Sequence, residues 1–297
     1  MMIREPCVAG QFYPAGRDAC VREIEALRRS LAASAAEPPV ALPARPVAGI
    51  VPHAGWTFSG ATALAVFDAI VARRPPKTFV LFGAVHTHRA RTSAIFSSGG
   101  WETPLGVAKI DERLAAEILA RAGDLVTDDP DAHEGEHSIE VQLPFIRRLA
   151  PDAKIVPITA YPNDRAVLLG LAVGQIIRDI EADAVCLGSS DLTHYGPAYG
   201  FTPKGFGAAA LRWVREENDR RMVDLMVRLD AEGAVAEART HSNACGPGAI
   251  AATLAAARIQ GAERGHVVHY TTSADVMREA MGREESDAAV GYAGVIF

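Results

Sequence analysis

Short apolar runs that alternate with segments of helical periodicity constrain the fold of this chain most strongly. Runs of this kind cover residues 47–51, 78–82, 154–159 and 184–187, and two further strand patterns cover 266–272 and 289–297. The run at 47–51 is bounded by prolines and is shorter than the roughly ten residues that a helix needs, so it predicts a buried strand. Helical spacing follows the runs, at 60–73, 111–122, 138–150, 165–180, 206–229 and 249–259, after a first helix at 18–33. This alternation predicts a doubly wound α/β protein.

Length and charge set limits on size and function. The 297 residues fit one large α/β domain or two smaller ones. A net charge of -6 provides no positive field for nucleic acid or for an anionic membrane surface. The N-terminus lacks the apolar core of a signal peptide, and no stretch reaches the roughly 18 apolar residues of a membrane span. We therefore expect a cytoplasmic protein that binds neither nucleic acid nor membrane.

Three of the predicted strands lead into turns that carry a histidine. The strand at 47–51 reaches His53 through a proline, and the strand at 78–82 reaches His86 through Gly83-Ala84-Val85. The strand at 184–187 leads through Gly188-Ser189-Ser190 to His194. A single loop histidine is usually an ordinary solvated or hydrogen-bonded residue. Because the carboxyl ends of parallel strands meet at one edge of a sheet, we expect these three histidines to converge there.

A cysteine at a predicted helix start completes this set of possible metal ligands. The four cysteines are scattered and form no CxxC pair, which excludes a disulfide scaffold. Cys245 lies just before the apolar helix at 249–259. Imidazole binds iron, copper and zinc, and a thiolate favours softer ions. The helix dipole and a nearby cation would lower the thiol pKa and favour a ligating thiolate. Alternatively, Cys245 is a buried and inert apolar residue.

Two choices of ligand remain open at this point. His88 occupies the same loop as His86 and is an alternative ligand, although His86 is nearer the strand end. The acidic loop at 128–138 is rich in carboxylates and imidazoles that metals bind. Such loops are usually only solvated, so we assign no metal role to it.

Proton transfer is the second chemical function that the turn at 188–196 suggests. Asp191 stands three residues before His194, close enough to orient its ring or to stabilise the protonated imidazole, as a general acid/base pair requires. The alternative is that Asp191 closes an Asx-turn. No G-x-S-x-G elbow frames Ser189 or Ser190, which argues against a serine hydrolase.

Several short motifs follow one another in a fixed order along the chain. They are Pro52-His53-Ala54-Gly55, Gly83-Ala84-Val85-His86, Glu136-His137-Ser138-Ile139-Glu140, Leu143-Pro144, Ser189-Ser190-Asp191 with His194, and Cys245-Gly246. This ordered set resembles the Memo family, whose bacterial and archaeal members are often labelled AmmeMemoRadiSam system protein B. The likeness runs from Glu5 to the final strand. It implies a single domain over residues 1–297, in which helices flank a central mixed, mostly parallel sheet similar to that of class III extradiol dioxygenases of the protocatechuate 4,5-dioxygenase type.

The resemblance also implies roles for individual residues. His53 and His86 are expected as metal ligands, Cys245 stands where the dioxygenases carry a glutamate, and His194, assisted by Asp191, stands where they carry a catalytic base. A thiolate is itself oxidisable, so the ring-cleaving reaction does not carry over directly.

These roles lead to an expected function and to its alternatives. We expect a non-haem oxidoreductase that uses Fe(II), with copper or zinc as alternatives, on a small and aromatic or otherwise planar substrate. The alternative is a non-enzymatic protein that binds a peptide or partner, or handles metal, with a relict pocket. A radical SAM protein and an AMMECR-like protein are the partners that the family label implies.

Overall fold

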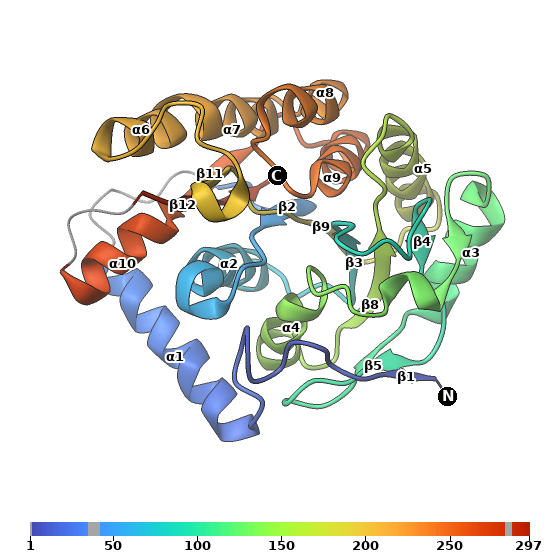
Figure 1. Ribbon diagram of the computed structural model, residues 1–297. Helices are drawn as coiled ribbons and strands as arrows, with labels where there is room; N and C mark the ends of the chain where they lie inside the picture. The colour runs from blue at the N-terminus through green and yellow to red at the C-terminus, as the bar shows by residue number, and fades with distance from the viewer. Residues whose placement is uncertain (1, 35–41, 283–286) are drawn as a thin grey trace.

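A mixed β-sheet forms the centre of the computed structural model, which describes residues 2–34, 42–282 and 287–297 (Figure 1). Its middle consists of four parallel strands in the order β2, β9, β3, β8. Antiparallel strands extend the sheet beyond β2 and beside β8. The strands are β2 (Ala48–Val51), β3 (Thr78–Gly83), β4 (Ala94–Ile95), β7 (Thr127–Asp128), β8 (Lys154–Thr159), β9 (Ala184–Ser189), β10 (His194–Tyr195), β11 (His266–Thr272) and β12 (Ala289–Ile296).

Helices cover both faces of this sheet. Figure 1 shows α5, α8 and α9 on one face and α1, α2 and α4 on the other. The helices are α1 (Arg17–Ser34), α2 (Trp56–Val71), α3 (Glu112–Ala122), α4 (Leu143–Leu149), α5 (Arg165–Asp179), α6 (Ala208–Trp213), α7 (Asp219–Val227), α8 (Ala231–His241), α9 (Pro247–Ile259) and α10 (Ser273–Met281). A π-helical turn, Val214–Asn218, joins α6 to α7. In the parts of the chain that the structure describes, no helix combines the length and the apolar character needed to cross a bilayer.

The core explains why the central strands are apolar along their whole length. Every residue of β2, β3 and β9 is buried, as expected for strands with helices on both faces. Beneath the sheet, Trp56 of α2 stacks on Phe145 of α4 with ring centroids 4.1 Å apart, and Phe67 adjoins the same ring. One hydrophobic cluster extends from Tyr13 to Phe297. The predicted α/β fold with a flanked mixed sheet is confirmed.

Strand register brings the carboxyl ends of the central strands to one edge. Val51, the last residue of β2, pairs with Ser189, the last residue of β9. Phe82 of β3 pairs with Gly188, one residue earlier on β9. These strands therefore end level, and the segments that follow them lie side by side.

The predicted helix at 138–150 is wrong in its first turns. The structure has a 3-10 turn at Glu140–Gln142 and an α-helix only from Leu143. The side chains of Ser138 and Glu140 accept hydrogen bonds from distant segments of the chain, and this stretch forms a turn and a 3-10 helix in place of regular α-helix. Pro144 then fits the first turn of α4, where its missing N–H has no partner to lose.

Other boundaries also differ from the prediction. Helix α2 begins at Trp56, four residues before the predicted start at 60, and helix α8 was not predicted. The segment at 99–106 lies outside the predicted helices and strands. It contains β5 (Gly100–Trp101), which pairs with β6 (Ala108–Lys109) and with β1 (Ile3–Arg4) in a small separate sheet.

Candidate metal centre

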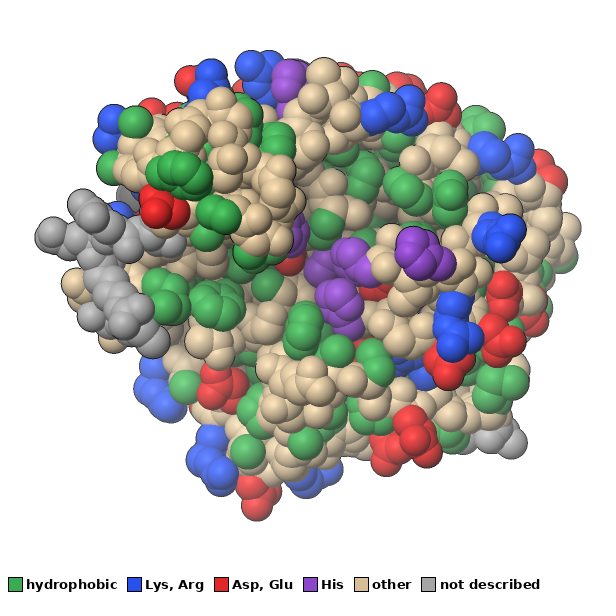
Figure 2. Space-filling model, in the orientation of Figure 1, with side chains coloured by type: hydrophobic (Ala, Val, Ile, Leu, Met, Phe, Trp, Pro, Cys, Tyr) green, Lys and Arg blue, Asp and Glu red, His purple; other side chains and the backbone are tan. Residues whose placement is uncertain are grey.

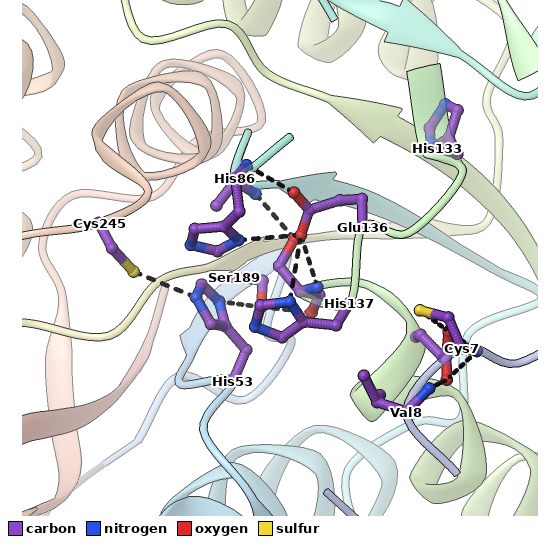
Figure 3. Close-up of polar contacts among 12 residues, drawn as sticks. Cys7, Val8, His53, His86, His133, Glu136, His137, Ser189 and Cys245 are labelled. Atoms are coloured by element: carbon purple, nitrogen blue, oxygen red, sulfur yellow. Dashed lines mark hydrogen bonds and ion pairs between the residues drawn. The ribbon is translucent and has the colours of Figure 1, made fainter. Parts of the chain in front are cut away.

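Three histidine rings converge at the carboxyl edge of the sheet (Figure 3). His53 follows β2, His86 follows β3, and His137 lies in the turn before the 3-10 helix. The His86 and His137 rings stack with centroids 4.8 Å apart, and the His53 ring stands nearly perpendicular to both, at 5.0 and 5.5 Å. One ring nitrogen from each residue lies within 4.8 Å of the other two. Three imidazoles are thus close enough to share one metal ion.

The hydrogen bonds around His53 determine which of its ring nitrogens carries the proton. Ser189 Oγ lies 3.0 Å from His53 Nδ1, donates its hydroxyl proton to the carbonyl oxygen of Ser138 at 2.7 Å, and accepts a bond from Gln142 Nε2 at 3.2 Å. With its single proton already used, the Ser189 hydroxyl can only accept from His53. Nδ1 therefore carries the hydrogen and Nε2 presents a lone pair. Burial, together with the neighbouring histidines, lowers the pKa of His53 well below its usual range, so the ring is neutral.

A buried carboxylate orients His86 in the same way. Glu136 accepts from the backbone N–H of His86 at 2.7 Å and from its Nδ1 at 3.0 Å. Burial alone would raise the pKa of Glu136, but the hydrogen bonds and charge of His86, with the backbone N–H of Ser138, lower it strongly. Burial also disfavours protonation of His86, but its contact with Glu136 outweighs that effect and raises its pKa. His86 Nδ1 is thus a donor, and Nε2 is left to face another ligand. A carboxylate that holds the far side of an imidazole is a common arrangement behind metal-ligating histidines.

Cys245 contacts the Nε2 side of the His53 ring. Its Sγ is 3.1 Å from His53 Nε2, and its backbone N–H donates to the carbonyl oxygen of Asp191 at 3.2 Å. Ligand atoms of His53, Asp191 and Cys245 form a second group within 4.8 Å of one another. His53 therefore belongs to both groups of possible ligands.

The protein groups around Cys245 raise the pKa of its thiol, whereas the expected lowering depended also on a nearby cation. The residue directly precedes α9, but burial, together with the negative charge of Asp191, raises the thiol pKa far above its usual range. Desolvation and a neighbouring carboxylate both disfavour the thiolate. A directly bound cation is what would convert this thiol to a thiolate.

Asp191 and His194 are both at the site but are not a hydrogen-bonded pair. Asp191 Oδ1 accepts from the backbone N–H groups of His53 at 2.7 Å and Ala54 at 3.3 Å, so it fixes the loop that carries the first histidine. His194 Nδ1 instead lies 3.1 Å from the carbonyl oxygen of Leu192. The carboxylate and the imidazole act on one another through charge, because His194 counteracts the rise in the Asp191 pKa that burial causes.

The structure distinguishes His86 from the alternative ligand His88 and shows which residues of the acidic loop reach the site. His88 is exposed and takes no part in either ligand group, whereas His86 does. The acidic loop contributes two residues, Glu136 and His137, to the site. Sequence reasoning missed both of them, although each lies in a motif that it had singled out. His133 of the same loop is buried elsewhere, against Phe96 and Trp101.

The histidines form the floor of a cleft of about 460 Å³. Figure 2 shows them gathered in a hollow with hydrophobic side chains around it. The polar part of the lining comes from His53, His86, His137, Asp191, His194 and Ser273. The larger apolar and aromatic residues that line it are Phe12, Phe58, Tyr199, Met277, Val290 and Tyr292. A cleft of this size with a few convergent polar groups is suited to a small ligand. Cys245 is not part of the lining and lies behind His53.

The donors present fit a transition metal. Imidazole nitrogens bind zinc at about 2.0–2.1 Å and thiolates at about 2.3 Å, so two such ligands of one tetrahedral ion lie roughly 3.5 Å apart. The separation of 3.1 Å between His53 Nε2 and Cys245 Sγ is close to that value. The lone pair on His53 Nε2 and the orientation of His86 by Glu136 also suit metal binding, although His86 and Cys245 belong to different ligand groups that share only His53.

Comparison with known proteins places the chain in a family. The model of the Memo-like protein family matches residues 4–296. A MEMO1 family protein from Thermococcus onnurineus is 39% identical over 303 residues, which cover 100% of this chain and 99% of the relative. One from Pyrococcus abyssi is 39% identical over 304 residues, which cover 99% of both chains. Among solved structures, an uncharacterized protein, JW3007, from Escherichia coli K12 matches 84% of this chain and 99% of its own, with a TM-score of 0.48 and 14% identity. The resemblance inferred from the motifs is thus confirmed, and the chain belongs to the Memo-like protein family.

Proposed function

We propose that this protein is a non-haem metal-dependent oxidoreductase that acts on a small, aromatic or otherwise planar substrate. Fe(II) is the proposed metal, with copper or zinc as alternatives. The observation that carries the proposal is the locking of two imidazoles by Ser189 and Glu136, which leaves the Nε2 atoms of His53 and His86 as ligand positions. Metal sites depend on such supporting contacts, and their loss typically weakens metal binding about 10–100-fold.

His53, His86 and Cys245 are the proposed ligands. His53 is the shared member of both ligand groups, and its Nε2 lies 3.1 Å from the sulfur of Cys245. His137 is the competing third ligand, because its ring stacks on His86 at 4.8 Å and its nitrogen belongs to the three-histidine group. Burial lowers the pKa of His137, which keeps its ring neutral and able to bind metal.

The surrounding residues support proton transfer in this cleft. A bound Fe(II) would supply open positions for substrate and for dioxygen as the oxidant. His194 lines the cleft, and the contact of its Nδ1 with the carbonyl oxygen of Leu192 leaves Nε2 to take a proton from a substrate hydroxyl. Asp191 lines the same cleft, and its carboxylate and the His194 imidazole interact through charge. Phe12, Phe58 and Met277 supply apolar surface to pack against a ring.

Metal analysis of anaerobically purified and reconstituted protein tests the metal site. We expect about one equivalent of metal in the wild type, and loss of most of it in His53→Ala and His86→Ala. His88→Ala is the matched control, because this exposed histidine lies in the same loop as His86, and it should retain full metal. The pair Cys245→Ser and His137→Ala identifies the third ligand by which variant loses more metal. Wild-type protein without iron, copper or zinc, or a His53→Ala variant with unchanged metal content, would contradict the proposal.

Turnover needs a separate measurement. Dioxygen uptake with catechols should be detectable for the iron-loaded protein and should fall by at least about 100-fold in His194→Ala, as expected for loss of a general base. The variant should still bind metal at the wild-type stoichiometry. Equal rates in wild type and His194→Ala would remove this residue from the proposed reaction.

The apolar border of the cleft favours a second candidate function, the binding of a peptide or a partner protein without turnover. Tyr199 is half-exposed beside the cleft, and Phe58 and Met277 are only partly buried. Such side chains are suited to peptide anchors as well as to a small molecule. A stable complex with a radical SAM or AMMECR-like protein that Met277→Glu disrupts, together with no dioxygen uptake, would favour this alternative.

A further inference from the structure

A buried polar cluster lies directly behind the strand that carries His194. Its centre is Asp219, the first residue of α7, which the π-helical turn precedes. Asp219 Oδ1 accepts from the backbone N–H of Thr193 at 2.9 Å and from its hydroxyl at 2.5 Å, and Oδ2 accepts from the Tyr270 hydroxyl at 2.7 Å. Asn218 donates to the same Thr193 hydroxyl at 2.9 Å. Asp219, Asn218 and Thr193 are fully buried, so these bonds do not compete with solvent.

These contacts determine where His194 can lie. Thr193 is its direct neighbour in the chain, and Thr193 and Leu192 are bonded to Gly291 of β12 through their backbone groups. The side chain of Thr193 points away from the cleft to Asp219, while His194 lines the cleft. Successive residues of an extended segment face opposite sides, so fixing Thr193 on one side fixes the direction of His194 on the other.

Strand β12 packs closely against the Asp219 carboxylate at Gly291. A Cβ atom on Gly291 would lie 1.9 Å from Asp219 Oδ2, which no side chain tolerates. A carboxylate with three donors can be buried at acceptable cost, whereas an unpaired one cannot. Burial still raises the pKa of Asp219 to about 6, against the lowering effect of its bonds from Thr193 and Tyr270.

The cluster also reaches the loop that carries Cys245. Asn243 Nδ2 donates to the carbonyl oxygen of Asn218 at 2.8 Å, and Asn218 Nδ2 donates to that of His241 at 3.1 Å. Asn243 is fully buried two residues before Cys245. Asn218 and Asp219 therefore contact both the segment that carries His194 and the loop that carries Cys245.

We infer that Asp219 is a positioning residue, which holds Thr193 and thereby directs the His194 ring into the cleft with Nδ1 bound to the Leu192 carbonyl. This inference rests on the proposed function insofar as His194 moves a proton there. The position of the ring itself can be measured without metal or turnover. The side-chain and backbone groups that donate to the Asp219 carboxylate belong to Thr193 and Tyr270, and neither residue lines the cleft.

The tautomer of His194 gives a direct readout of this role. In the wild type, the Leu192 carbonyl accepts from Nδ1, so His194 should be in its Nδ1–H form, which ¹⁵N NMR of histidine-labelled protein distinguishes from Nε2–H. Measured at pH 8 on metal-free protein, Asp219→Asn should reduce the Nδ1–H fraction of His194 by at least half. Tyr270→Phe is the matched control, because it removes one bond to Asp219 but none to Thr193, and it should retain the wild-type tautomer.

The outcomes separate positioning from simple stabilisation. If Asp219→Asn lowers the melting temperature as Tyr270→Phe does but leaves the His194 spectrum unchanged, the inference is wrong. Should Asp219→Asn not fold, Thr193→Val takes its place, since it removes the hydroxyl bond and should shift the tautomer in the same direction. Thr193→Ser should restore the wild-type spectrum. A wild-type His194 tautomer in Thr193→Val would likewise overturn the inference. A shifted tautomer in protein that binds no metal would leave the inference intact and contradict only the proposed function.

Discussion

Ser189 Oγ lies 3.0 Å from His53 Nδ1 and donates its own proton to the carbonyl oxygen of Ser138. This relationship fixes the His53 tautomer and turns a lone pair on Nε2 toward Cys245. A serine that looks like a nucleophile in the sequence thus serves as an acceptor for an imidazole. The contact connects the end of β9 to the loop after β2.

Replacing this serine tests how much the locked tautomer contributes. We expect Ser189→Ala to weaken metal binding by about 10–100-fold, the usual cost of losing a contact behind a ligating histidine. Competition with a chromogenic chelator would measure the dissociation constant. Ser93→Ala is the control, because Ser93 is also buried and its hydroxyl also accepts a hydrogen bond, but the donor is the backbone N–H of Tyr161 and not a histidine. Equal affinities for the two variants would show that the tautomer needs no support from Ser189.

Glu140 should be a major determinant of stability. Its carboxylate accepts from Arg4 at 2.8 Å, from the Tyr13 hydroxyl at 2.9 Å and from backbone N–H groups of the N-terminal loop. The side chains of Arg4 and Glu140 are only 9% and 0% exposed. Because Glu140→Ala leaves a buried guanidinium without its partner, we expect a loss of roughly 3–5 kcal/mol in the free energy of unfolding.

Urea denaturation measures this loss, and an exposed ion pair provides the comparison. Glu232 pairs with Arg258 at 2.8 Å, but both side chains are largely exposed. Glu232→Ala should therefore cost at most about 1 kcal/mol. A Glu140→Ala variant as stable as Glu232→Ala would contradict the structural role of the buried pair.

His133 should make the protein sensitive to acid. It is fully buried between aromatic rings, and burial, followed by the positive charge of Arg4, lowers its pKa to about 3. In the unfolded chain this histidine binds a proton near its usual pKa of 6.5. Its contribution to stability is therefore complete above pH 6.5 and is lost as the pH falls from 6.5 to about 3, at about 1.4 kcal/mol for each pH unit.

The variant His133→Phe removes this titration. Its free energy of unfolding, followed by denaturant titration between pH 7 and pH 4, should fall less steeply with acidification than that of the wild type. Exposed His88 provides the matched control, and His88→Phe should keep the wild-type slope. Parallel curves for His133→Phe and the wild type would show that other groups cause the acid sensitivity.

The contact between α5 and α9 depends on glycine. A Cβ on Gly170 would lie 2.1 Å from the carbonyl oxygen of Ala252. Gly170→Ala must push the two helices apart, and we expect it to lower the free energy of unfolding by about 1–3 kcal/mol. Gly16, around which there is open space, is the control, and Gly16→Ala should change stability by less than about 0.5 kcal/mol. Thermal unfolding of both variants tests this, and a Gly170→Ala protein as stable as the wild type would show that the helices can separate freely.

The sequence by itself determined the strands and the histidines that follow them. The run at 154–159 matches β8 residue for residue, and His53 and His86 both follow the carboxyl ends of parallel strands as predicted. These features depend on local hydrophobic patterning, because a strand covered on both faces has to be apolar throughout. The order of motifs along the chain likewise identified the family.

Only the tertiary structure decided which polar side chains meet. His137 and Glu136 lie about 50 residues after His86 in the chain, and Ser189 lies over 130 residues after His53, yet each of these residues contacts its histidine. The pKa of the Cys245 thiol is raised by burial and by Asp191, neither of which the sequence shows. Periodicity reports which face of an element is buried, whereas proton positions, ligand groups and pKa shifts depend on distances of a few ångströms between segments that are distant in sequence.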